Sequence, residues 1–202
     1  YVINVMRSLR PLDLGAGRIV AEREARIHAA SMQAPWADGD DVAAPLDLYR
    51  GEVEPDWVDY NGHMSEWAFL TAFGWASDRL FRFIGMDEDY RSSGNTFFTA
   101  ETHINFVKEA SLGDPLRIAT QVLGVDAKRL HLFHSMKHAE TGVQLAPTEQ
   151  MLLHLDTDDP RTAPILDRPA AALAAIPTPP SALPAPPPAC RVITPGPHPD
   201  PP

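Results

Sequence analysis

Apolar residues recur at helical spacing over one long stretch of the chain. Between Trp67 and Ile84 they stand mostly three or four positions apart, and Gly85 follows the last of them; this spacing predicts a helix. Ser65 is a suitable N-cap, and Glu66 in the first turn would interact favourably with the helix dipole. Because apolar residues occupy much of the circumference, we expect the helix to be largely buried.

The other apolar positions indicate strands on either side of this helix. Leu46, Leu48 and Trp57 belong to the first predicted strand, and Asp59-Tyr60-Asn61-Gly62 is a turn after it. Alternating or β-branched residues predict four more strands, at 96–106, 116–123, 129–138 and 146–155. One strand, one long helix and four strands are the order of an α+β domain in which a helix packs against an antiparallel sheet.

The distribution of these elements divides the chain into four parts. Residues 1–30 contain two helical stretches around Pro11 that cannot bury their apolar faces alone, so we expect them to be the end of a larger domain. Residues 31–45 are polar and turn-forming, typical of a linker. The α+β domain occupies residues 46–157. Residues 158–202 are rich in Pro and Ala, and we expect this tail to be mostly disordered.

Composition and charge exclude several classes of function. The net charge is −10 and no basic stripe is present, which argues against nucleic acid or an anionic membrane surface as partner. No apolar run is long enough for a membrane span or a signal sequence. The single cysteine, Cys190, cannot form a disulfide within the chain. We therefore expect a cytoplasmic protein.

Two motifs resemble those of a known enzyme family. Asp59-Tyr60-Asn61-Gly62-His63-Met64-Ser65 resembles the Asp-x-x-Gly-His-x-Asn segment of thioesterases related to 4-hydroxybenzoyl-CoA thioesterase, although Ser65 stands where many relatives have Asn. Ala110-Ser111-Leu112-Gly113-Asp114-Pro115-Leu116, which follows Ile104-Asn105-Phe106, resembles the strand, turn and strand of the same family. Two matches in the correct order are more specific than either alone.

The resemblance implies the hotdog fold, an antiparallel sheet wrapped around one long central helix. It also implies an acyl-CoA thioesterase that needs no cofactor, since CoA is part of the substrate. In this family the site lies at a dimer interface, so the resemblance implies a homodimer or homotetramer.

The residue types fit thioester hydrolysis. A thioester carbonyl needs a nucleophile or an activated water on one side and hydrogen-bond donors for the developing oxyanion on the other. In the family the Asp of the motif is the base or nucleophile, which here is Asp59, and the amides at the helix N-terminus would polarise the carbonyl. Catalytic candidates are Asp59, His63, Asn61, Glu66 and Thr102; substrate-binding candidates are Trp57, Tyr60, Ser65, Trp67, Glu101 and His103.

Plainer interpretations exist for several of these residues. An Asp-x-x-Gly segment is a common turn, and His63 beside it is suited to capping or packing as well as to catalysis. Glu101 and His103 alternate along a strand and are consistent with a solvated or subunit-facing side. The remaining histidines do not suggest a metal site, because three of them lie along one predicted strand where they cannot converge on an ion.

A narrower resemblance concerns the substrate. The segments 57–66, 101–104 and 121–134 resemble the thioesterase domains fused to bacterial L-carnitine dehydrogenases, and residues 1–30 look like the end of a 3-hydroxyacyl-CoA-dehydrogenase-like domain. The resemblance implies hydrolysis of betainyl-CoA to glycine betaine and CoA. Aromatic faces bind trimethylammonium groups well, and Trp57, Tyr60, Trp67 and Phe98 are near the predicted site in sequence.

Two other functions compete with hydrolysis. Hotdog enoyl-CoA hydratases also use Asp and His, but their motif resembles Asp-x-Asn-Pro-x-His; here His63 comes four residues after Asp59, and Gly62 replaces the Pro. The other is a non-catalytic acyl-CoA-binding or dimerisation module that serves the adjoining dehydrogenase. The chain has no Gly-x-Gly-x-x-Gly segment with which to bind NAD by itself.

Overall fold

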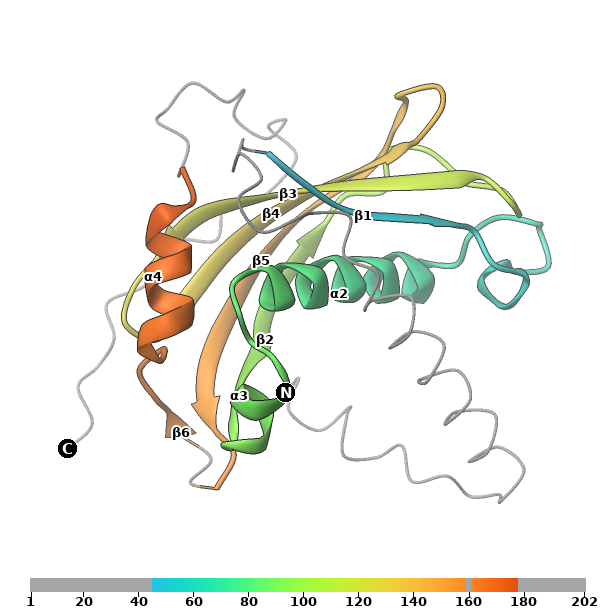
Figure 1. Cartoon of the computed structure of the whole chain (residues 1–202). Coiled ribbons are helices and arrows are strands. Elements are labelled where there is room, and N and C mark those ends of the chain that lie inside the picture. The colour runs from blue at the N-terminus through green and yellow to red at the C-terminus, as the bar shows by residue number, and fades with distance from the viewer. Residues whose placement is uncertain (1–44, 159–160, 178–202) are drawn as a thin grey trace, which may run out of the picture. The chain divides into compact units, whose positions relative to one another are not determined.

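A computed structural model describes residues 45–158 and 161–177 of the 202-residue chain. They form one curved antiparallel sheet with a long helix against its concave side (Figure 1). In chain order the elements are β1 (Leu46–Glu52), the 3-10 turn η1 (Pro55–Trp57), α2 (Glu66–Phe83), α3 (Glu88–Ser92), β2 (Asn95–Ile104), β3 (Pro115–Val125), β4 (Arg129–His138), β5 (Gln144–Asp156), β6 (Arg161–Thr162) and α4 (Asp167–Ala175).

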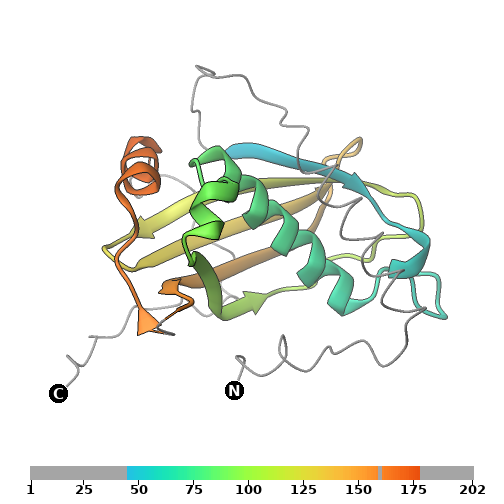
Figure 2. The same cartoon turned by 60° about the horizontal axis from the view of Figure 1, so that its bottom comes forward.

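The order of strands in the sheet is β1-β3-β4-β5-β2, with the short β6 paired to β5. The sheet curls around α2, which runs across its strands (Figures 1 and 2). The predicted α+β arrangement, an antiparallel sheet around one long helix, is therefore confirmed. Among the helices of the described residues, none is long and apolar enough to cross a membrane.

The core lies between α2 and the sheet. One face of α2 presents Ala68, Ala72 and Phe73, all completely buried, to inward-facing residues of the strands such as Ile118 and Met136. Small alanines let the sheet approach the helix closely, and each large side chain removed from water contributes roughly 1.5–3 kcal/mol. Apolar alternation along β3 and β4 supplies the other half of this contact.

The opposite face of α2 differs from the prediction of a largely buried helix. Trp67 and Leu70 are 47% and 45% exposed in the single chain, and Gly74 is exposed as well. A single sheet covers only one side of a helix, so apolar residues on the other side stay accessible. The first strand also ends earlier than predicted, at Glu52, because Pro55 has no N–H for the ladder and starts η1.

The C-terminal boundary also differs from the prediction of a mostly disordered tail from residue 158. Arg161–Thr162 add a strand to the sheet, and α4 buries Leu173 to 1% exposure, with Ile165 and Ile176 also buried. These few apolar contacts order a segment whose composition resembles that of a tail. Residues 178–202, like 1–30 and 31–44, lie outside the described residues.

The core contains a polar cluster where α2 meets the sheet. His134 on β4 contacts Ser77 of α2 through Nε2 (3.1 Å) and Thr120 of β3 through Nδ1 (2.9 Å). Ser77 in turn donates to Oε1 of Gln150 on β5 (3.1 Å). Burial lowers the pKa of His134 to about 4, so the imidazole is neutral in the folded protein at neutral pH.

Leu173→Ala tests whether α4 is an integral part of the domain. We expect the free energy of unfolding to fall by about 2–5 kcal/mol, because the change leaves a cavity under the helix. Leu166→Ala, the same chemical change at a residue that is 41% exposed, should cost under about 1 kcal/mol. Urea unfolding measures both; equal effects would show that α4 does not pack on the domain.

His134 makes stability depend on pH in a defined direction. Its folded pKa of about 4 lies below the ordinary 6.5, so the unfolded chain binds a proton first as the pH falls. The stabilisation should be complete above pH 6.5 and decline by a few kcal/mol towards pH 4. Urea unfolding across this range should show a smaller decline in His134→Gln. Parallel curves for the two proteins would contradict the assignment.

Candidate active site

The loop between η1 and α2 turns back on itself within a few residues. Val58 and Met64 form an isolated antiparallel bridge. Within it the Asp59 amide donates to the His63 carbonyl (2.9 Å), and the Gly62 amide donates to the Asp59 carbonyl (3.0 Å). Gly62 has φ +79°, although a Cβ there would meet nothing within 4 Å. The left-handed backbone, rather than a lack of space, therefore favours glycine at this turn.

The Asp59 carboxylate is held inside this turn. Its Oδ1 accepts hydrogen bonds from the backbone amides of Asn61 (2.8 Å) and His63 (3.3 Å), and its Oδ2 accepts one from the Asn61 side chain (3.2 Å). The hydrogen bond from the Asn61 amide is the largest cause of a lowered pKa of Asp59. Desolvation, the second-largest effect, raises this pKa, but the hydrogen bonds from the His63 amide and the Asn61 side chain and the electrostatic effect of His63 lower it further. Asp59 is thus ionised at neutral pH, fixed in orientation and exposed.

The two motifs that resemble the thioesterase family lie side by side. The Met64 amide donates to the Ala110 carbonyl (2.8 Å), and His63 forms an isolated bridge with Ser111. The turn of the second motif is closed by Asp114, whose Oδ2 accepts from the Ser111 amide (2.8 Å). Segments far apart in sequence therefore support the Asp59 loop together.

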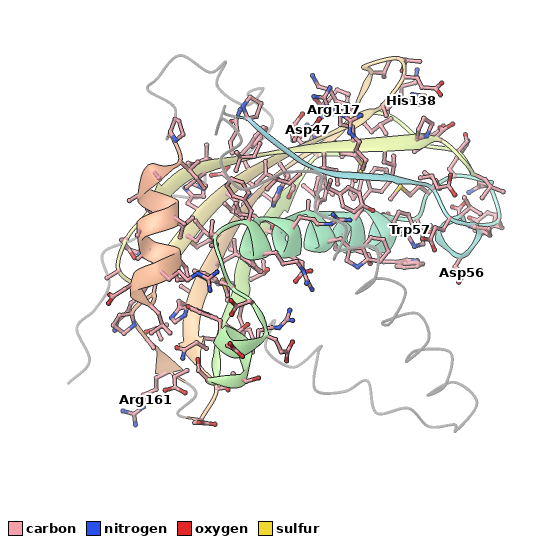
Figure 3. The ribbon with its side chains drawn as sticks, viewed as in Figure 1. Asp47, Asp56, Trp57, Arg117, His138 and Arg161 are labelled. Atoms are coloured by element: carbon pink, nitrogen blue, oxygen red, sulfur yellow. The ribbon has the colours of Figure 1, made fainter. Side chains whose placement is uncertain are left out.

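Trp57 connects the Asp59 loop to the core. Its carbonyl accepts from the Ser65 amide (2.8 Å), and its completely buried ring packs on Trp75 of α2 with ring centres 5.1 Å apart. Figure 3 shows Trp57 and its neighbour Asp56 at the end of the molecule where α2 begins. Trp57 was predicted to contact substrate, but its ring belongs to the core. Within residues 45–158 and 161–177, the buried indole N–H has no hydrogen-bond partner.

α2 begins directly after the loop. Ser65 occupies the predicted N-cap position, but its hydroxyl makes no capping hydrogen bond; its carbonyl accepts from the amides of Ala68 (2.9 Å) and Phe69 (3.4 Å). The first amides of a helix point away from it and attract negative charge. Glu66, the first helical residue, is exposed. The carboxylate loop and a helix N-terminus are therefore adjacent.

A second group of predicted residues lies on β2. Glu101 and His103 point to the same side and are joined by an Oε1 to Nε2 contact of 2.6 Å. Thr102, half-buried, is opposite Gln150 on β5. In the described part of the chain, no hydrogen bond or ion pair joins these residues to Asp59. One chain therefore presents the predicted residues as two separate groups.

The remaining aromatic candidates are accessible. Tyr60, at the tip of the Asp59 loop, is 97% exposed, and Trp67 in the first turn of α2 is 47% exposed. Phe98 on β2 is 46% exposed. Unlike Trp57, these rings are available for contact with a ligand or with another protein chain.

Two contacts between a histidine and a glutamate were not predicted from the sequence. His63 Nε2 lies 3.5 Å from Oε2 of Glu109, an exposed residue just before the second motif. His131 on β4 contacts Glu149 on β5 at 2.6 Å. The contact between His63 and Glu109 can be predicted only if the two motifs are known to touch. The contact between His131 and Glu149 can be predicted only if the register of β4 and β5 is known.

The sequence segment that contains the Asp59 loop is acidic. The segment from Gly51 to Glu66 contains no Lys or Arg. Its carboxylates are Glu52, Glu54, Asp56, Asp59 and Glu66. Within the described ranges, no three His, Cys, Asp or Glu side chains are grouped so that they could hold a metal ion. The local charge therefore favours a cationic group close to the loop.

Comparison with known proteins gives consistent matches. The family model of the thioesterase-like superfamily matches residues 53–177. A betainyl-CoA thioesterase from Pseudomonas aeruginosa is 45% identical over 120 residues, which cover 59% of this chain and 76% of that protein. An L-carnitine dehydrogenase/betainyl-CoA thioesterase from Agrobacterium fabrum is 40% identical over 163 residues, which cover 80% of this chain. The chain spans 32% of the length of that bifunctional relative.

A solved structure supports the same assignment. The crystal structure of a candidate thioesterase from Pseudomonas putida KT2440 superposes with a TM-score of 0.59 at 40% identity, covering 66% of this chain and 86% of that one. The family model covers most of the chain and includes both motifs, the helix between them and the α4 extension. The predicted resemblance is confirmed: the chain belongs to the thioesterase-like superfamily, whose hotdog fold it has.

Proposed function

We propose that this chain hydrolyses an acyl-CoA thioester at the Asp59 loop. The observation that carries the proposal is the Asp59 carboxylate, fixed by two backbone N–H groups beside the N-terminus of α2. An ionised carboxylate and a set of helix amides are the two components that a thioester carbonyl needs. The acyl oxygen would point to the amides of the first turn, and Asp59 would approach the carbonyl carbon or a water next to it.

Two roles of Asp59 are compatible with this geometry. As a base, Asp59 takes a proton from water, whose oxygen attacks the carbonyl carbon. As a nucleophile, it forms an anhydride that water then cleaves. In both cases the C–S bond breaks, CoA leaves and takes up one proton, and water supplies the oxygen of the released acid. The lowered pKa keeps Asp59 ionised for either role.

Betainyl-CoA is the proposed substrate. Two relatives carry this activity in their names, and the acidic loop and exposed aromatic rings suit a trimethylammonium group. In betainyl-CoA the positive charge is next to the reacting carbonyl. A helix N-terminus repels a cation, so nearby carboxylates such as Glu66 would offset that repulsion. A neutral acyl group would gain nothing from them.

A second copy of the chain would complete the site. β2 is an edge strand, and apolar side chains are exposed on β2, just after it and on the outer face of α2. They are Trp67, Leu70, Phe98 and Phe106. Covering them in a homodimer or homotetramer would bring Glu101, Thr102 and His103 of one copy towards Asp59 of another. A dehydrogenase domain in the full-length protein and a cytoplasmic location are further parts of the proposal.

Asp59→Asn tests the catalytic assignment. The amide keeps the shape of the carboxylate but neither accepts a proton nor attacks a carbonyl, so we expect kcat to fall by a factor of about 100 or more. Binding of CoA and the melting temperature should change little. The matched control is Asp56→Asn, a second exposed aspartate in the same acidic segment, which should keep more than half of the activity.

Thiol release measured with a disulfide reagent gives the comparison directly. Equal losses in the two variants would show that Asp59 contributes only charge to the loop. Full activity in Asp59→Asn would refute its catalytic role. Tight binding of CoA esters by the wild-type chain without any thiol release would identify a binding module, and hydration of crotonyl-CoA without CoA release would identify a hydratase.

Substrate charge is tested with a neutral isostere. We expect kcat/KM for betainyl-CoA to exceed that for 3,3-dimethylbutyryl-CoA, in which carbon replaces the nitrogen, by at least about tenfold at low salt. The ratio should shrink as salt screens the acidic loop. Glu66→Gln should lower the ratio while leaving hydrolysis of the neutral ester nearly unchanged. Equal rates for the two esters would contradict selection by charge.

A further inference from the structure

Three cations stand side by side on the outer face of the sheet. Arg50 on β1 is the Cα partner of Arg117 on β3, which is the partner of Lys137 on β4. Residues flanking them, such as Leu116 and Met136, are buried against α2, so alternation turns the cations to the other side. Figure 3 shows Arg117, together with Asp47, on the side of the sheet away from α2. We call Arg50, Arg117 and Lys137 the basic row.

Asp47 fixes two members of the row. Its Oδ2 lies 2.6 Å from Arg50 Nη2, and its Oδ1 lies 3.0 Å from Arg117 Nε. The two arginine side chains nevertheless remain 63% and 46% exposed. Lys137 is exposed and, within the part of the chain that the structure describes, has no ion-pair partner. One carboxylate thus orients two guanidinium groups. Glu52, two residues beyond Arg50 on the same side of β1, is a second carboxylate near the row, and the three cations still exceed these two carboxylates.

This arrangement costs stability unless an anion offsets it. Like charges directly opposite each other on neighbouring strands repel, and here three follow one another across the sheet. The whole chain has 17 Lys and Arg against 27 Asp and Glu, so a compact group of cations is a local exception. A charged residue on an edge strand protects that edge from pairing with another chain, which accounts for Arg50 on β1. Arg117 and Lys137 lie on β3 and β4 inside the sheet, so edge protection does not account for them.

Small side chains lie next to the basic row on the same face. Two residues beyond Arg117 and two before Lys137 are Ala119 and Ser135, which are Cα partners of each other. Neither side chain is long enough to cover the cationic groups. The Ser135 hydroxyl donates a hydrogen bond to Oε1 of Gln144 (2.9 Å). An anion can therefore reach the basic row from the side of Ala119 and Ser135.

We propose that the basic row binds a phosphate-bearing anion. Two guanidinium groups supply forked N–H donors that match phosphate oxygens, and Lys137 adds a point charge. Two sources share this chemistry, the 3′-phosphate of CoA and inorganic phosphate. The first source rests on the proposed function: the acidic loop would receive the cationic acyl group and the basic row the phosphate end of the same substrate. The second does not depend on hydrolysis.

Calorimetric titration with CoA, dephospho-CoA and inorganic phosphate tests the proposal on the full chain. We expect CoA to bind about tenfold or more tightly than dephospho-CoA, which lacks the 3′-phosphate. Arg117→Gln and Lys137→Gln should reduce this ratio several-fold. The control is Lys128→Gln, the same loss of charge in the turn between β3 and β4, which should leave the ratio unchanged. Thermal melts confirm that each variant is folded.

Each outcome has a defined meaning. A reduced ratio in both row variants supports binding of the CoA phosphate. Unchanged ratios, with binding of inorganic phosphate that Lys137→Gln abolishes, support a phosphate site separate from the substrate. Unchanged ratios without such phosphate binding overturn the proposal, even if the chain hydrolyses thioesters. Phosphate binding to the row in a chain that releases no thiol would instead overturn the proposed function alone.

Discussion

A single helix lying on a curved sheet buries only one of its faces, and most features of this protein depend on that constraint. The inward face of α2, with Ala72 and Phe73, builds the core. The outward face, with Trp67 and Leu70, stays accessible in the single chain. The same packing fixes the helix N-terminus at one end of the sheet, next to the Asp59 loop. The core, the exposed apolar face of α2 and the place of the Asp59 loop all follow from this one contact.

Backbone hydrogen bonds fix the conformation of the Asp59 loop. Backbone hydrogen bonds of Trp57 and Ala110 hold the loop, and the Asn61 and His63 amides with the Asn61 side chain fix the Asp59 carboxylate. This explains how an exposed aspartate has a defined orientation. It also explains why the two sequence motifs occur together, since the second motif holds the first in place. The carboxylates of the Asp59 segment and the cations of the basic row are separate groups of opposite charge, which suits a substrate that is cationic at one end and anionic at the other.

Much of the fold follows from local patterns, and the failures have physical causes. The strand 129–138 is predicted at its true bounds because apolar alternation continues along its whole length. α4 is missed because its Ala-rich sequence, with Pro169 in the first turn, resembles a tail. Contacts with the rest of the domain, such as the burial of Leu173 and Ile176 and the ion pair of Arg168 with Asp87, order it. Such contacts are set by the tertiary structure and leave no periodic signal in so short a segment.

The candidate site was predictable in part for a similar reason. The contacts of Asp59 and its turn join residues that are close in sequence, so the motif is enough to predict their geometry. Local sequence does not decide whether an aromatic ring near the motif faces substrate or core. Both are possible for Trp57 from the sequence, and the structure places its ring in the core. The Glu109 contact to His63 needs two distant segments to meet. Within the described residues of one chain, no hydrogen bond or ion pair joins Glu101 or His103 to Asp59, and local sequence patterns do not show how these groups are related.

The central claim is that the ionised Asp59 carboxylate performs the chemistry, and the pH dependence of kcat/KM tests it most directly. The hydrogen bonds to Asp59 lower its pKa, so the acidic limb should lie below the ordinary value of about 3.9 for Asp. Each point requires a check by circular dichroism that the protein is still folded. A flat profile down to about pH 4 agrees with the account. An acidic limb between about pH 6 and 7, the ordinary range of histidine, would contradict it and transfer the essential role to a histidine.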